Sequence, residues 1–60
     1  MNTRLLIRAL CRYRKSKQEA LKSNIKHGRT DLSDKNIRQI LEIDTSIDEL
    51  ENQLIEERLN

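Results

Sequence analysis

A chain of sixty residues with no proline and one glycine, near its middle, has few ways to fold. Glycine and proline are the residues that most often end helices and mark turns. Gly28 opens the segment 28–33, which holds most of the turn chemistry of the chain, and a glycine readily takes the left-handed conformation that closes a helix. We therefore predict an all-α fold, a single domain in which helices over about 3–27 and 34–59 form an antiparallel hairpin around a turn at 28–33.

Residues at the expected helix ends support these boundaries. Asn2 or Thr3 is placed to act as the N-cap of the first helix, because a short polar side chain can accept hydrogen bonds from the first free N–H groups. Ser33 has the same chemistry for the second helix. Leu32 and Ile37 have the spacing of a hydrophobic staple around that cap.

The second helix carries the stronger apolar pattern. Its aliphatic residues recur at alternating spacings of three and four, as in a coiled coil, and further ones widen the stripe to about half of the circumference. The predicted association seam consists of Ile37, Ile40, Ile43, Ile47, Leu50 and Leu54, and the widening residues are Leu41, Ile55 and Leu59. One neighbouring helix cannot cover so wide a stripe. We therefore predict that the hairpin dimerises into a four-helix bundle or docks on a helical partner.

The first helix has a thinner apolar stripe, in which we expect Tyr13 to be a core residue. A short turn makes the helices antiparallel neighbours, so that residues whose numbers add up to about 61 should meet. The expected pairs are Leu6 with Ile55, Leu10 with Leu50, Tyr13 with Ile47 and Leu21 with Ile40. The same rule predicts a register ion pair between Lys17 and Asp44. The alternative is that the long Lys17 side chain extends to solvent.

Charges of opposite sign are divided between the two halves. Residues 1–30 hold nine Lys or Arg and one acid, whereas residues 31–60 hold three basic residues and nine acids. This division favours the antiparallel pairing. Six cations share the face of the first helix opposite its apolar stripe: Arg4, Arg8, Arg12, Lys15, Lys22 and Lys26. We interpret this basic face as a solvated helix surface, and the alternative is a contact surface for nucleic acid or another anionic partner.

The residue types of a catalytic or metal site do not come together in this sequence. Asp44, Asp48 and Glu51 lie at spacings of four and three, which a helix with many acids produces by chance. Cys11 is the only cysteine, and with the single His27 it does not make a zinc site. We therefore predict no enzyme activity, no catalytic residue, no metal, no cofactor and no small-molecule substrate.

The apolar runs are too short for a membrane span, which needs about 18 apolar residues or more. The longest run is residues 5–7, and Arg4 and Arg8 flank it too closely for a secretory signal. We expect a cytoplasmic protein without a membrane partner.

Residues 44–52 carry a family resemblance. Their sequence is Asp-Thr-Ser-Ile-Asp-Glu-Leu-Glu-Asn, in which Ile47, Asp48, Leu50 and Asn52 match a pattern of Ser-Gln-x-Leu-Asp followed by x-Leu-x-Asn. The stretch from Gly28 to Leu54 thereby resembles the small sporulation-regulating aspartyl-phosphate phosphatases of bacilli. The resemblance implies a helical hairpin that dephosphorylates response regulators, with Asp48 as the functional acid.

Taken together, these patterns favour binding over catalysis. We predict a small regulatory or adaptor protein, of the kind that phages and bacteria encode, that acts as a homodimer or on a helical protein partner. Nucleic-acid binding through the basic face is the first alternative, which we do not favour because no aromatic residue accompanies the cations to stack on bases. Phosphatase activity on a response regulator is the second.

Overall fold

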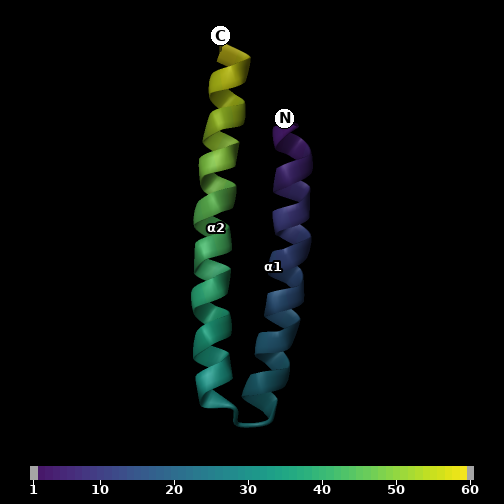
Figure 1. Ribbon diagram of the computed structural model, residues 1–60, viewed down its shortest axis with the longest axis vertical. Helices are drawn as coiled ribbons and strands as arrows, with labels where there is room; N and C mark the ends of the chain where they lie inside the picture. The colour runs from purple at the N-terminus through teal and green to yellow at the C-terminus, as the bar shows by residue number, and fades with distance from the viewer. Residues whose placement is uncertain (1, 60) are drawn as a thin grey trace.

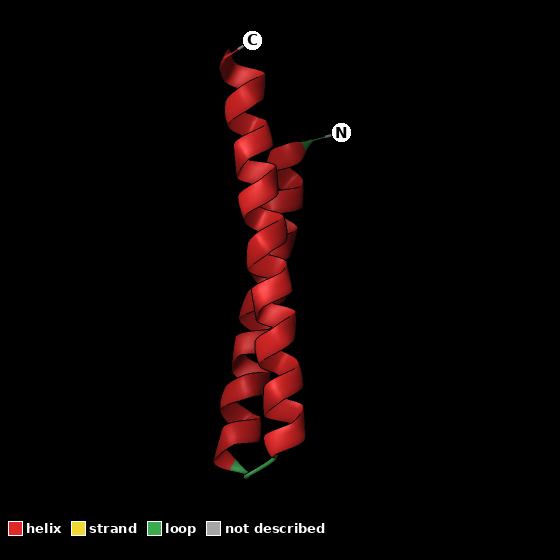
Figure 2. Cartoon of the chain, turned by 90° about the vertical axis from the view of Figure 1, so that its left-hand side faces the viewer, coloured by secondary structure: helices red, strands yellow, loops and turns green. Residues whose placement is uncertain are grey.

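Two antiparallel helices joined by a short turn make up the chain (Figure 1). The computed structural model describes residues 2–59, with α1 at Thr3–Lys26 and α2 at Thr30–Leu59. The hairpin is a rod whose Cα atoms extend over 49 × 15 × 13 Å. Because α2 is six residues longer than α1, its C-terminal end projects beyond the start of α1 (Figures 1 and 2). The predicted all-α hairpin is confirmed.

Asn2 caps the start of α1. Its side-chain oxygen accepts hydrogen bonds from the backbone N–H groups of Arg4, at 3.1 Å, and Leu5, at 3.3 Å. These are two of the N–H groups that have no partner within a helix, so the cap satisfies them without water. The N-cap predicted at Asn2 or Thr3 is thus Asn2.

The turn is shorter than predicted. Gly28 has a φ of +68°, and the N–H of Arg29 donates to the carbonyl oxygen of Asn24 at 2.8 Å, which closes α1. The chain therefore reverses over residues 27–29, and α2 begins at Thr30.

The predicted turn at 28–33 with Ser33 as N-cap is consequently wrong. Ser33 lies inside α2, where its N–H and its Oγ both donate to the carbonyl oxygen of Arg29, at 2.9 and 2.8 Å. The reason is that one left-handed residue suffices to reverse the chain, so the polar residues that follow it are free to continue as helix. Leu32 and Ile37, predicted as a staple around Ser33, are both exposed residues of this helix.

The helix register lies close to the predicted one. Three pairs of side chains hydrogen-bond between the helices: Thr3 with Glu57 at 3.4 Å, Arg14 with Asp44 at 2.8 Å and Asn24 with Asn36 at 2.7 Å. The residue numbers add up to 60 for the first and third pairs, within the predicted sum of about 61, and to 58 for Arg14 with Asp44.

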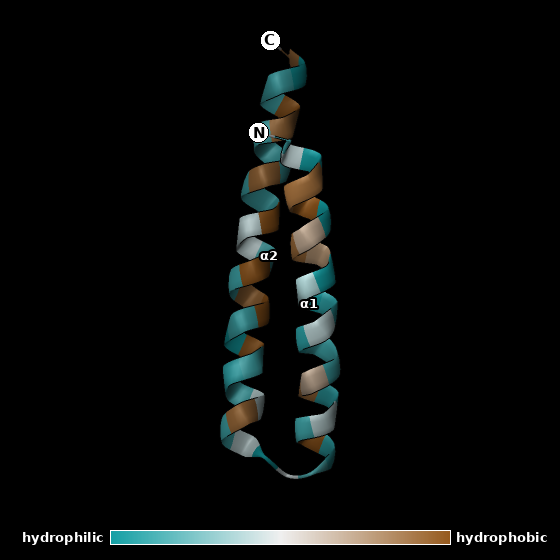
Figure 3. Ribbon diagram, turned by 45° about the vertical axis from the view of Figure 1, so that its right-hand side comes forward, coloured by the Kyte–Doolittle hydropathy of each residue, from teal (hydrophilic) through white to brown (hydrophobic). Residues whose placement is uncertain are grey.

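Covered positions recur at spacings of three and four along both helices, as in a coiled coil. The positions with this spacing are Thr3, Ile7, Leu10, Arg14, Lys17, Leu21 and Asn24 in α1, and Ser33, Asn36, Ile40, Ile43, Ile47, Leu50 and Leu54 in α2. Beside them, six further residues are half-buried: Leu6, Cys11, Ala20, Gln39, Asp44 and Ser46. Hydrophobic segments follow the inner edge of α2 over most of its length (Figure 3). Within residues 2–59, however, the buried hydrophobic residues are Ile43 and Ile47 alone.

Tyr13 does not belong to this core. Its side chain is 50% exposed, so its predicted core position is wrong. The physical reason is that the seam runs through Leu10, Arg14 and Lys17, which leaves position 13 beside the seam rather than in it.

Candidate interaction surface

The seam divides the surface of the hairpin into two sides. On one side Arg14 donates from Nη1 to Oδ1 of Asp44, at 2.8 Å, and from Nη2 to Sγ of Cys11, at 3.9 Å. We call this the Asp44 side. On the other side the ammonium group of Lys17 lies 5.2 Å from the centre of the Tyr13 ring. We call this the Tyr13 side, because positions 11 and 13 of a helix point about 200° apart.

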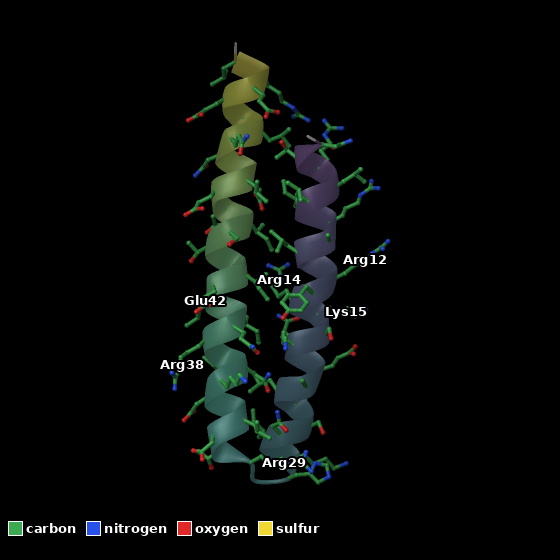
Figure 4. The ribbon with its side chains drawn as sticks, in the orientation of Figure 1. Arg12, Arg14, Lys15, Arg29, Arg38 and Glu42 are labelled. Carbon is green, nitrogen blue, oxygen red and sulfur yellow. The ribbon has the colours of Figure 1, made fainter. Side chains whose placement is uncertain are left out.

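Asp44 thus pairs with Arg14, and the predicted pair with Lys17 is wrong. The register set by the short turn brings Arg14 opposite Asp44, and in Figure 4 the Arg14 side chain points into the space between the helices. The hydrogen bond to Asp44 raises the pKa of Arg14 above its usual value. Because both side chains are partly exposed, the pair serves to fix the register more than to add stability.

Eight large hydrophobic side chains are exposed on the described residues: Leu5, Tyr13, Ile25, Leu32, Ile37, Leu41, Ile55 and Leu59. The helix geometry places four of them on the Asp44 side, namely Ile25, Ile37, Leu41 and Ile55. Three of these, Ile25, Ile37 and Leu41, lie near the turn and are 62%, 44% and 60% exposed. The Asp44 side therefore carries an apolar cluster that its own chain does not cover.

Most of the predicted association seam faces α1, where the expected pairs had placed Ile40, Ile47 and Leu50. Ile43 and Ile47 are buried, and Ile40, Leu50 and Leu54 are half-buried, at the positions that face α1. These five residues hold the hairpin together. Of the six predicted seam residues, only Ile37 remains exposed, so the surface left for a partner lies to one side of the seam.

The six residues of the basic face are all exposed: Arg4, Arg8, Arg12, Lys15, Lys22 and Lys26. Figure 4 shows Arg12 pointing away from α2. The ion pair Arg14–Asp44 is the one that the structure shows within residues 2–59. The charges of the basic face, and most of the carboxylates of α2, are therefore available to a partner.

A shallow groove runs along the turn-proximal half of α1 on the Asp44 side. It is lined by Lys15, Gln18, Glu19, Leu21, Lys22 and Ile25. Leu21 and Ile25 supply an apolar floor, and the long polar side chains form its rim. The apolar stripes predicted from the sequence did not reveal this groove, because a groove depends on how neighbouring side chains pack and not on periodicity alone.

A polar pair in the seam was also missed. Asn24 Nδ2 donates to Asn36 Oδ1 at 2.7 Å, and Asn36, which is buried, in turn donates to Gln39 Oε1 at 3.4 Å. Both asparagines interrupt an apolar stripe at matching distances from the turn, and that coincidence is the sequence signal for the pair. A buried asparagine at such a position fixes register at a cost in stability.

The carboxylates that the sequence analysis singled out lie along α2. Asp48, the acid singled out by the phosphatase resemblance, is exposed, and Asp44 is occupied by Arg14. Among residues 2–59 no three His, Cys, Asp or Glu side chains converge as a metal site would require. Neither α1 nor α2, over the same residues, has the length and apolar character that crossing a membrane demands.

Comparisons with protein-family models, with curated proteins and with solved structures found no match. The resemblance of residues 44–52 to the phosphatase family stays a prediction.

Proposed function

We propose that this chain works by binding, as a small regulatory or adaptor protein that docks the Asp44 side of its hairpin against helices and so completes a four-helix bundle. The observation that carries the proposal is the exposed aliphatic cluster of Ile25, Ile37 and Leu41. Contiguous exposed apolar residues rimmed by polar ones are typical of protein interaction surfaces.

The size of the exposed surface supports this proposal. The chain exposes 4986 Å², whereas a compact monomer of 7.1 kDa exposes about 4,100 Å². The difference, roughly 900 Å², is close to the ~800 Å² that each partner buries in an interface of standard size. One docked hairpin would therefore bring the exposed surface to the value of an ordinary folded domain.

The sparse core points in the same direction. Within residues 2–59 the buried hydrophobic residues are Ile43 and Ile47, which are few for a domain that must offset the conformational entropy of its chain. Docking would bury the aliphatic cluster as well, and binding to the folded state stabilises it by mass action.

Site-specific photo-crosslinking tests the proposal. A benzophenone amino acid is placed at position 41, on the Asp44 side, or at position 38, whose Arg38 side chain points away from α1 in Figure 4. We expect irradiation in cells to give a discrete adduct from position 41 and none from position 38. Equal labelling from both positions, or no adduct from position 41, would contradict the proposal. The mass of the adduct identifies the partner as a second copy or another protein.

A second candidate function is nucleic-acid binding through the basic face, favoured by the exposure of all six of its cations. A contact that uses about six cations should weaken by roughly 10³-fold between 50 and 200 mM salt. Binding of duplex DNA or RNA, measured by fluorescence anisotropy, should then decrease in Arg8→Ala and Lys15→Ala. No binding of the unaltered chain at 50 mM salt would exclude this function.

A further inference from the structure

We propose that the partner of the Asp44 side is a second copy of this chain, packed with both turns at the same end, so that α1 of each copy lies on α2 of the other. This inference rests on the proposed function and specifies its partner. It follows from three properties of one surface: its shape, the heights of its charges and the sign of those charges.

The first property is a match between a groove and two protruding side chains. Within the hairpin, residues at equal distance from the turn have numbers that add up to about 59, as the three inter-helix hydrogen bonds show. Ile37 and Leu41 of α2 are therefore level with Lys22 and Gln18 of α1. Both α1 residues line the groove with the apolar floor.

A two-fold axis parallel to the helices exploits this match. Such an axis keeps every residue at its own height and places α1 of one copy opposite α2 of the other. Ile37 and Leu41 of each copy then enter the groove on α1 of the other copy. The surface is self-complementary, which a two-fold symmetric interface requires.

The second property is that opposite charges lie at the same heights. Lys15 is level with Asp44, and Arg8 is level with Glu51. Lys15, Arg8 and Glu51 are exposed on the Asp44 side and take no part in the ion pair within the hairpin. In the proposed dimer Lys15 and Arg8 of each copy therefore face carboxylates of the other copy, Asp44 and Glu51.

The third property excludes the reversed arrangement. A dimer of the same faces with its turns at opposite ends would stack α1 on α1 and α2 on α2. The first half of the chain has nine basic residues and one acid, and the second half has nine acids and three basic residues. Like charges would then face one another along the whole interface, which disfavours that arrangement.

Distances between two spin labels test this orientation. Thr30 is exposed at the turn and makes no side-chain hydrogen bond that the structure shows, so Thr30→Cys in a Cys11→Ser background carries one label per chain. Packed helices lie ~8–10 Å apart, so pulsed electron paramagnetic resonance should give a distance under roughly 25 Å between the turns of two copies. The label at Asp31→Cys should give the same result, and circular dichroism checks that both variants remain helical.

Each other outcome overturns the inference. A distance of about 36 Å, the length of the 24 residues of α1 at ~1.5 Å each, would show turns at opposite ends. The absence of any distance between copies, at concentrations where the chain is helical, would show that it does not pair with itself. In that case an adduct of position 41 with a different protein would still support the proposed function, whereas no adduct would remove both.

Discussion

Replacement of Leu41 by alanine should weaken the dimer about 100-fold. The side chain is 60% exposed in the single hairpin, and docking can bury that part. Leu→Ala removes about three methylene equivalents, each of which contributes ~0.8 kcal/mol when it is fully buried. Docking buries the 60% that is exposed in the single hairpin, so the substitution should cost about 1.4 kcal/mol of binding free energy per site. Two sites per dimer give about 3 kcal/mol, which corresponds to the 100-fold change in the dissociation constant.

Leu59→Ala is the matched control. Leu59 is 81% exposed, more than Leu41, but it lies where α2 projects beyond the start of α1. In the proposed dimer it meets no helix of the other copy, so its removal should leave the dissociation constant unchanged. Sedimentation velocity over a concentration series measures both constants. Equal constants for Leu41→Ala and Leu59→Ala would refute the reasoning.

Three further predictions concern the hairpin itself and its chemistry. Gly28→Ala should lower the free energy of unfolding by ~1–2 kcal/mol, measured by urea denaturation, because φ is +68° and the cost is conformational, with nothing within 4 Å of the added Cβ. Gly28→Asn should lose less, and no difference between them would contradict the backbone explanation. Asn36→Ala should lower the same free energy by about 1–3 kcal/mol, because Asn24 loses its buried partner, and an unchanged midpoint would show that the pair adds nothing. A phosphorylated receiver domain should lose its phosphate equally fast with this protein and with its Asp48→Ala variant, and faster loss with the unaltered chain would instead support the phosphatase resemblance.

The sequence predicts best where a local signal decides the structure. The sole glycine reverses the chain because its left-handed φ needs no tertiary contact, and the Asn2 cap works through its own neighbouring N–H groups. Ser33 misled the prediction for a related reason. As an N-cap its side-chain oxygen would accept from a backbone N–H, whereas inside the first turn of α2 its hydroxyl donates to the carbonyl oxygen of Arg29. Which of the two forms depends on how soon the turn ends.

The register between the two helices, and the side of the seam on which a residue lies, were harder to predict because both depend on the length of the turn. Asp44 pairs with Arg14, at a sum of 58, rather than with Lys17, at a sum of 61, and Tyr13 lies beside the seam. The apolar stripe of α2 was predicted correctly as too wide for one neighbour. Which of its residues would remain exposed followed only from the register, and so did the alignment of Leu41 with the groove on α1.

The central claim is that a second copy of the chain covers the exposed apolar residues of the Asp44 side. The molar mass in solution tests this claim most directly. Sedimentation equilibrium of the unaltered chain at low salt should give twice 7.1 kDa, and the mass should fall toward 7.1 kDa as salt screens the facing charges. A mass of 7.1 kDa at every concentration, for a chain that circular dichroism shows to be fully helical, would contradict the claim.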